Sequence, residues 1–222
     1  MRWIGLSLGL SIGLAGMARL APAGEEPAMI AGRLIAAPIV LDQAQDYVIE
    51  RMDVRGGYDV PALALRGDLP KVVIRDSRFG YSRSGGGPAA AVMAQGANVG
   101  RFSATDCEFY DAENQVFSLV QGHFGHVVIE RCTFRTSDSF LREIVERNPW
   151  RNGPPVAEFA NIERLELLDV AFENTRVIIH PSVKVVILRG DIRDIEVMDP
   201  GTQVRWLAPE PHDDAVLAAA VG

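Results

Sequence analysis

The chain contains little of what would mark several common types of protein. It has two cysteines among 222 residues, and no histidine lies at ligand spacing from them, which argues against a zinc site. Positive charge is in the minority, 22 Lys and Arg against 29 Asp and Glu, so the chain is a poor general binder of nucleic acid. Its apolar runs lack the i, i+3, i+4, i+7 spacing of amphipathic helices, and no two-residue Asn-Gly or Asp-Gly hairpin joins one run to the next. These absences argue against helical and simple sandwich folds.

A short sequence motif recurs along the chain instead. Residues 72–79 (VVIRDSRF) return as residues 127–134 (VVIERCTF), with apolar residues at positions one, three and eight. Successive copies begin 19 to 38 residues apart, and most starts lie 20 to 30 residues apart. A period of this size predicts a stacked solenoid. The looser copies begin at Tyr47, Phe102, Leu165, Val185 and Val204.

Within each copy, inward-facing and outward-facing side chains alternate as in a β-strand, and this alternation then shifts by one residue. Val72 and Ile74 are expected to face inward and Arg75 outward. The alternation shifts at Asp76, which predicts a sharp bend between two short strands. A further apolar run ends six to nine residues before each copy and predicts a third strand per turn. These runs are residues 39–41, 62–65, 90–93, 116–119, 156–159, 177–179 and 195–198.

Three short strands per turn, always in this order, describe an all-β fold, a parallel β-helix. In this pattern the chain resembles the right-handed, pectate-lyase-like parallel β-helix superfamily over residues 33–207. The resemblance implies about seven turns and a ligand groove along the strand that precedes each copy. It implies no single activity, because this fold carries many functions. The carboxylate clusters of the family's lyases and polygalacturonases are not found on that strand.

The N-terminal residues 1–23 are predicted to be a secretory signal peptide. Arg2 precedes an apolar stretch over residues 3–18, and the segment ends in an Ala-Pro-Ala exit at 21–23. An uncleaved membrane anchor is the alternative, but the stretch is shorter than the ~20 residues that span a bilayer. Cleavage removes Arg2 and Arg19, which takes the net charge from −7 to −9 and leaves no stable membrane insertion. The mature protein is therefore expected in the periplasm or outside the cell.

The remaining chain divides into three parts. Residues 24–37 are expected to cap the first turn, and residues 38–207 to form the β-helix domain. Residues 208–222 are expected to be either a tail or a short capping helix with an acidic start at Asp213.

The two cysteines occupy the same position of consecutive copies. Cys107 and Cys132 both stand at position six, so stacking places them about 4.8 Å apart in neighbouring turns. That separation permits a disulfide. The alternative is a reduced pair stacked in the core, as small buried thiols often are.

Charged residues also align when the copies are stacked. Opposite charges are expected beside one another up the outside of the stack, where each pair contributes about 0.2–1 kcal/mol. Adjacent Asp76 and Asp106 would suit calcium, but we expect Arg51 and Arg131 to neutralise them, so no cofactor is predicted. The residues at position five are Arg51, Asp76, Asp106, Arg131, Asp169 and Arg189.

One corner of the predicted groove combines chemically useful side chains. Glu158 and His180 are the candidate catalytic pair, as an acid and a base. The candidate substrate-binding residues come from the same strands and from two long loops, where binding residues concentrate. They are Arg176, Trp150, Arg151, Asn152, Tyr81 and Arg83.

The sequence thus favours an exported β-helix that binds a polysaccharide or glycoconjugate, or serves as a scaffold, without catalysis. The first alternative is a small polysaccharide lyase, glycoside hydrolase or epimerase that uses Glu158 and His180. The second is a purely structural module that assembles end to end or side to side.

Overall fold

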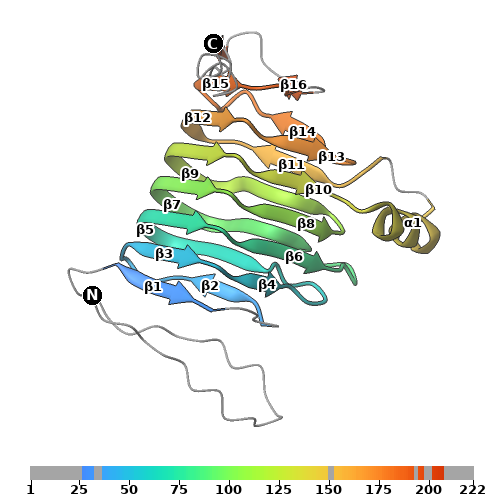
Figure 1. Ribbon diagram of the computed structural model, residues 1–222. Coiled ribbons are helices and arrows are strands. Elements are labelled where there is room, and N and C mark those ends of the chain that lie inside the picture. Colours follow the sequence, from blue (N-terminus) through green and yellow to red (C-terminus); the bar gives the residue numbers. More distant parts are fainter. Residues whose placement is uncertain (1–26, 33–36, 150–152, 193–194, 198–201, 208–222) are drawn as a thin grey trace, which may run out of the picture.

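The computed structural model describes residues 27–32, 37–149, 153–192, 195–197 and 202–207. Within these residues the protein consists mainly of parallel β-strands stacked one above another, with an α-helix at one side (Figure 1). The predicted all-β class and its parallel pairing are therefore confirmed. The predicted signal peptide and the residues 208–222 lie outside the described part of the chain.

Among the described residues, the strands form a larger and a smaller parallel sheet. The smaller sheet contains β4 (Asp53–Arg55), β6 (Arg78–Ser82), β8 (Glu108–Ala112), β10 (Thr133–Arg135) and β13 (Ala171–Glu173). The larger sheet contains β1 (Ala28–Ala31), β2 (Ile39–Leu41), β3 (Tyr47–Glu50), β5 (Leu63–Arg75), β7 (Ala90–Thr105), β9 (Gln115–Glu130), β11 (Val156–Phe159), β12 (Ile162–Leu168), β14 (Arg176–Ile179), β15 (Val185–Arg189), β16 (Ile195–Val197) and β17 (Gln203–Trp206).

Each copy of the recurring motif forms one rung of this stack, that is, one layer of strands that pairs with the layers before and after it. Its first residues lie directly opposite one another, from Tyr47 through Val72, Phe102 and Val127 to Leu165. Part of the segment expected as an N-terminal cap forms β1, which adds a parallel strand beside β3. The register predicted for the first five copies is therefore confirmed.

The sixth copy is shifted by one residue from the prediction. Leu165 lies opposite Val186 rather than Val185, and Val204 also pairs with Val186. Because residues 185–188 are apolar without a break, the sequence pattern fits two registers, and the packing of Val186 into the core selects one. Arg189 consequently lies opposite Leu168 instead of in the column of Asp169, although its guanidinium still reaches the Asp169 carboxylate at 2.9 Å.

The predicted bend at position five has a common backbone conformation. Non-glycine residues with φ between +47° and +55° occupy this position in five successive copies, and Gly190 with φ +98° occupies it in the next. The left-handed conformation turns the strand, so the inward side chains resume one residue later. The five non-glycine residues are Arg51, Asp76, Asp106, Arg131 and Asp169.

Three separate strands per turn were expected, but in the central rungs two of the three form one continuous strand. β5, β7 and β9 are 13, 16 and 16 residues long, and each runs around a corner of the stack with irregular pairing at the bend. The apolar run at residues 90–93 also differs from the prediction in which side chains face outward. Val92 and Ala94 were expected to face outward, but both are buried with the core, and Met93 occupies the outer column beside Ala64 and Ser118.

Phenylalanines form a continuous column inside the stack. The rings of Phe79, Phe109, Phe134 and Phe172 follow one another with centroids 6.0, 5.0 and 4.9 Å apart and nearly parallel planes. Phe117 packs edge-on against Phe109 at 4.9 Å. The predicted vertical superposition of these position-eight residues is confirmed.

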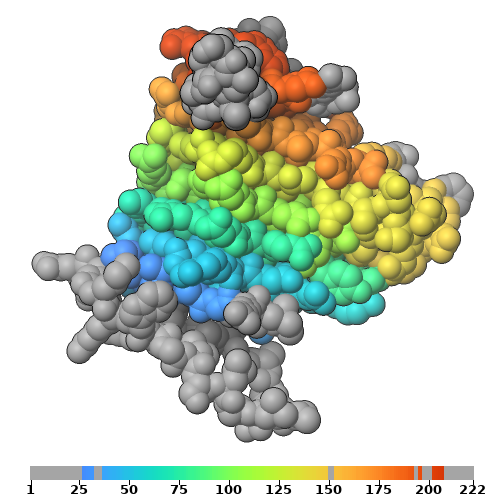
Figure 2. Space-filling model, in the orientation of Figure 1, coloured from blue at the N-terminus to red at the C-terminus, as the bar shows by residue number. Residues whose placement is uncertain are grey.

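A lateral insertion carries the helix α1 (Asp138–Arg147), which protrudes from the side of the stack (Figures 1 and 2). Ser137 caps its N-terminus, and Phe140 and Ile144 form its buried face. The helix comprises ten residues. In the part of the chain that the structure describes, no helix has the length and apolar character needed to cross a membrane.

Candidate functional site

The predicted catalytic pair is not joined by a hydrogen bond. Glu158 lies on β11 and accepts a hydrogen bond from the Gln115 side chain at 3.0 Å. His180 follows β14, and its Nε2 is buried without a hydrogen-bond partner among the described residues. Sequence reasoning therefore placed both residues in the same region but did not foresee that glutamine would bond the glutamate.

Three of the predicted substrate-binding residues have partners within the protein. Arg176 bonds Glu196 of β16 at 2.6 Å on the exposed surface. Arg83 forms an ion pair with Glu143 of α1, and its guanidinium lies over the rings of Tyr81 and Phe140 at 5.2 and 5.4 Å. Tyr81 and Arg83 thus help to hold α1 against the stack, and Trp150, Arg151 and Asn152 lie outside the described residues.

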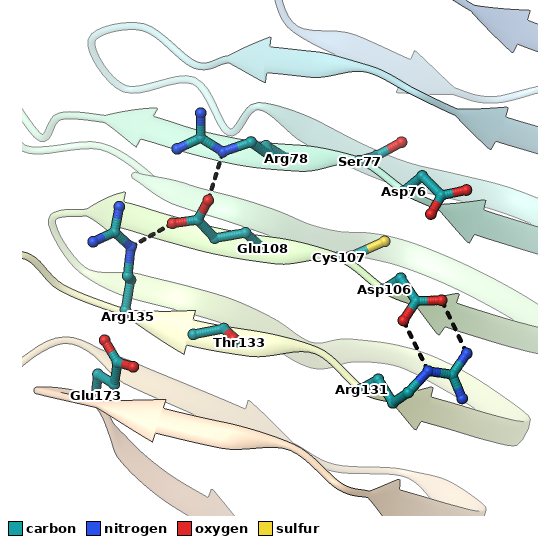
Figure 3. Close-up of a pocket in the computed structure, with 10 residues that line it drawn as sticks. All are labelled: Asp76, Ser77, Arg78, Asp106, Cys107, Glu108, Arg131, Thr133, Arg135 and Glu173. Carbon is teal, nitrogen blue, oxygen red and sulfur yellow. Dashed lines mark hydrogen bonds and ion pairs between the residues drawn. The ribbon is translucent and has the colours of Figure 1, made fainter.

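A hollow lies elsewhere, on the outer side of β6, β8, β10 and β13 (Figure 3). It is open and shallow, with a volume of about 670 Å³. It crosses four neighbouring strands, so it extends about 14 Å along the stack. We call it the ladder groove, and it is lined by Asp76, Ser77, Arg78, Asp106, Cys107, Glu108, Arg131, Thr133, Arg135 and Glu173.

One short outward side chain at position seven leaves room for the ladder groove. Thr133 stands at position seven, between Arg131 and Arg135 along the chain. Ser77 and Cys107, at position six of the two preceding rungs, are buried beneath the groove, at 1% and 4% exposure. The Ser77 hydroxyl donates to the Arg75 carbonyl at 2.5 Å and accepts from the Met52 amide at 3.1 Å. Ser77 is therefore held by its own backbone surroundings rather than activated by a base.

One side of the ladder groove is an ion-pair network around Glu108. Arg78 from the preceding rung donates to Glu108 at 2.5 Å, and Arg135 from the following rung donates to its other oxygen (Figure 3). Burial alone would raise the pKa of Glu108, but the two guanidinium groups outweigh burial and hold this pKa below its usual value. Glu108 therefore stays ionised at neutral pH.

The other side is formed by Asp106 and Arg131. The Arg131 guanidinium binds both carboxylate oxygens of Asp106, at 2.8 and 2.9 Å. This bidentate bond holds the pKa of Asp106 below its usual value. The expected neutralisation by Arg131 is confirmed, but Arg51 pairs with its neighbour Glu50 at 2.7 Å. Within the described residues, no cluster of three or more His, Cys, Asp or Glu has the spacing of a metal site.

Cys107 and Cys132 are adjacent and both thiols are free and buried. The Thr133 amide, which follows Cys132, bonds the Cys107 carbonyl at 2.9 Å, so the pair occupies neighbouring rungs as predicted. Each thiol donates a hydrogen bond to a backbone carbonyl, Cys107 to Thr105 at 3.1 Å and Cys132 to Glu130 at 3.2 Å. The neighbouring Cys107 side chain, together with burial, raises the pKa of the Cys132 thiol. Of the two alternatives left open by the sequence, the structure describes the reduced, stacked pair.

The ladder groove offers many hydrogen-bonding groups and keeps its acids ionised. Glu108 and Asp106 accept hydrogen bonds readily, but neither is poised to donate a proton near neutral pH. The predicted charge pairing along the outside is confirmed by the Arg78–Glu108 and Arg131–Asp106 pairs. Sequence reasoning identified these columns but treated them as purely structural. The signal that it did not use was the short side chain of Thr133 at position seven, directly opposite Glu108 in the preceding rung.

In the comparisons with known proteins, the chain matches no protein-family model, no curated protein and no solved structure.

Proposed function

We propose that the protein is an exported, right-handed parallel β-helix that binds a carbohydrate chain along its ladder groove without chemical conversion. The single observation that carries this proposal is the groove itself, an open polar trough that crosses four rungs. A trough of this form suits an extended polymer whose hydroxyl groups meet a regular series of donors and acceptors.

The chemistry of the lining supports binding. Arg78, Arg131 and Arg135 present planar donor groups, and Glu108 and Asp106 hold them in fixed orientations. Paired side chains lose little further conformational entropy when a ligand arrives. Such preorganised arginine and carboxylate groups are suited to hydrogen-bond the hydroxyls of a sugar.

The rival proposal, a small polysaccharide lyase, hydrolase or epimerase, receives less support. An acid/base pair needs two groups that exchange protons at a common reacting atom. Glu158 is bonded to Gln115, and His180 Nε2 is buried without a partner. The proposal of a binding protein is therefore the better match to the described geometry.

The proposal is tested by screening the purified protein against a panel of polysaccharides, recording both binding and release of products. We then expect Arg131→Ala to weaken binding of the retained polysaccharide about tenfold, which corresponds to about 1.4 kcal/mol. The reason is that Arg131 lines the ladder groove and loses its donors. Titration calorimetry measures the affinity of both proteins.

Arg164→Ala is the matched control. Arg164 is as exposed as Arg131, at 50% against 49%, and is likewise paired with a carboxylate, that of Glu166. It lies on β12, away from the ladder groove, so its removal should leave affinity unchanged. Equal losses in the two variants would refute the groove, and release of sugar products would refute a purely binding role.

A further inference from the structure

The last described strand carries core residues that no described residue covers. Val204 and Trp206 of β17 lie directly opposite Val186 and Leu188 of β15. Parallel neighbours in register direct their side chains to the same face of a sheet, so Val204 and Trp206 lie on the inward face. Yet Val204 is 39% exposed and Trp206 is 59% exposed.

These exposures differ sharply from the rest of their columns. The column that ends at Trp206 runs upward from Ile49 through Ile74, Ala104, Ile129, Leu167 and Leu188. Each of those six residues is at most 1% exposed, because the next rung covers it. Trp206 is thus a core residue placed at the open end of the stack, and Leu207 beside it is 47% exposed.

We propose that residues 208–222 of the same chain fold back over β17 and bury Val204, Trp206 and Leu207. The segment begins at the rim of this apolar end, because the Leu207 amide still bonds the Leu188 carbonyl at 2.8 Å. Pro209 and Pro211 follow at once and cannot donate to another rung of the ladder. We therefore expect the chain to turn away from the strand direction beside the residues that need cover.

The composition of the segment suits that role. Residues 215–221 (AVLAAAV) contain no polar side chain, and two aspartates precede them, as in the start of a helix. Nine residues in helical form span about 13 Å. Val204 and Trp206, two residues apart on a strand, are separated by only about 7 Å. A second copy of the chain is the competing occupant, and the test separates the two.

Trp206 itself is the reporter. With Trp3→Phe and Trp150→Phe it becomes the only tryptophan in the chain, so its emission maximum and its quenching by iodide measure its burial. We expect blue-shifted, protected emission from the full chain. Ending the chain at Leu207 should raise the quenching constant severalfold and shift the emission to the red.

Point variants keep the test valid if the shortened chain does not fold. Leu217→Asp places a charge on the apolar face formed by residues 216, 217, 220 and 221 of a helix, and should expose Trp206 like the truncation. Ala219→Asp places the same charge on the opposite face and should leave quenching unchanged. Circular dichroism confirms that each variant retains its strands.

Two results would overturn the proposal. In one, iodide quenches Trp206 equally in the full chain, the truncated chain and Leu217→Asp. In the other, light scattering shows a dimer of the full chain, and Trp206 loses protection on dilution, which assigns the end to a second copy. Retained protection in a monomer that Leu217→Asp abolishes supports the proposal.

Discussion

At the scale of single residues, the residue at position five has two roles: its backbone turns the chain, and its side chain can form an ion pair on the surface. Asp106 and Arg131 turn the chain in the left-handed conformation while their side chains pair across rungs. Aspartate and asparagine tolerate this conformation better than most residues, whereas arginine gains little from it locally. Arg131 at this position is therefore explained by its bidentate ion pair with Asp106 more than by its backbone preference.

Glu108 should give the protein a specific acid sensitivity. Its folded-state pKa lies below its usual value, so its contribution to stability is full above the unfolded-state pKa of about 4.3 and is lost as the pH falls through the folded-state pKa. We expect Glu108→Gln to lower the free energy of unfolding at pH 7 by about 1.5 kcal/mol, because two guanidinium groups lose an ionised acceptor. The difference from the original protein should shrink below about pH 4.

Urea unfolding at pH 7 and at pH 3.5 measures this difference. Glu146→Gln, at an exposed position of α1, is the control and should leave stability within about 0.5 kcal/mol at both pH values. A constant gap between Glu108→Gln and the original protein across this range would contradict the ionised role of Glu108.

At the scale of elements, each rung depends on its position-five turn. Arg51 has φ +55°, and its ion pair with Glu50 is exposed to solvent, so it contributes little energy. Glycine adopts this φ without strain, whereas valine does not. We expect Arg51→Val to be about 1–2 kcal/mol less stable than Arg51→Gly, as measured by denaturant unfolding.

The same two substitutions at Arg101 provide a control in which the order of stability of the valine and glycine variants should be reversed. Arg101 is an exposed residue within β7 and has no positive φ. Valine suits an extended strand better than glycine, so Arg101→Val should be the more stable variant. The same order of stability at both positions would mean that the turn at Arg51 does not govern the rung.

Much of each element was predictable, and the exceptions have physical causes. The register from Tyr47 to Leu165 follows from apolar residues at positions one and three and a charged residue at position five in each of these copies. Val186 and Met93 were assigned wrongly because apolar neighbours on both sides remove that information. The merging of two strands in β7 depends on hydrogen bonds to the adjacent rungs, which alternation within one segment does not reveal.

The candidate site was less predictable than the fold. The columns of charge follow from the register, so the partners of Arg78 and Arg131 could be expected. The hollow depends on differences in side-chain size between neighbouring rungs, which a comparison of charges alone misses. Gln115 as the partner of Glu158 could not be read from the repeat, because the pairing of β9 with β11 shifts by one residue beside it.

At the scale of the whole molecule, stability is distributed along the stack through contacts between neighbouring rungs. Phe109 is the centre of the phenylalanine column, with ring contacts to Phe79, Phe134 and Phe117. We expect Phe109→Ala to lower the free energy of unfolding by about 3–5 kcal/mol, because a large cavity opens between rungs. Chemical denaturation followed by circular dichroism measures the loss.

Phe172→Ala is the comparison within the same column. Phe172 contacts Phe134 on one side and is only partly buried, so its removal should be clearly less damaging. Equal losses at the two positions would indicate that the column does not act as a series of neighbouring contacts.

The insertion that carries α1 has an evolutionary consequence. It leaves the stack after β10 and returns before β11, while the pairing of β9 with β12 and of β10 with β13 continues past it in register. New sequence can therefore accumulate at this corner while the neighbouring rungs keep their pairing, apart from a one-residue shift where β11 begins. Related chains should accordingly differ in length first between β10 and β11, where new surfaces can form. The residues of their inner columns should change more slowly.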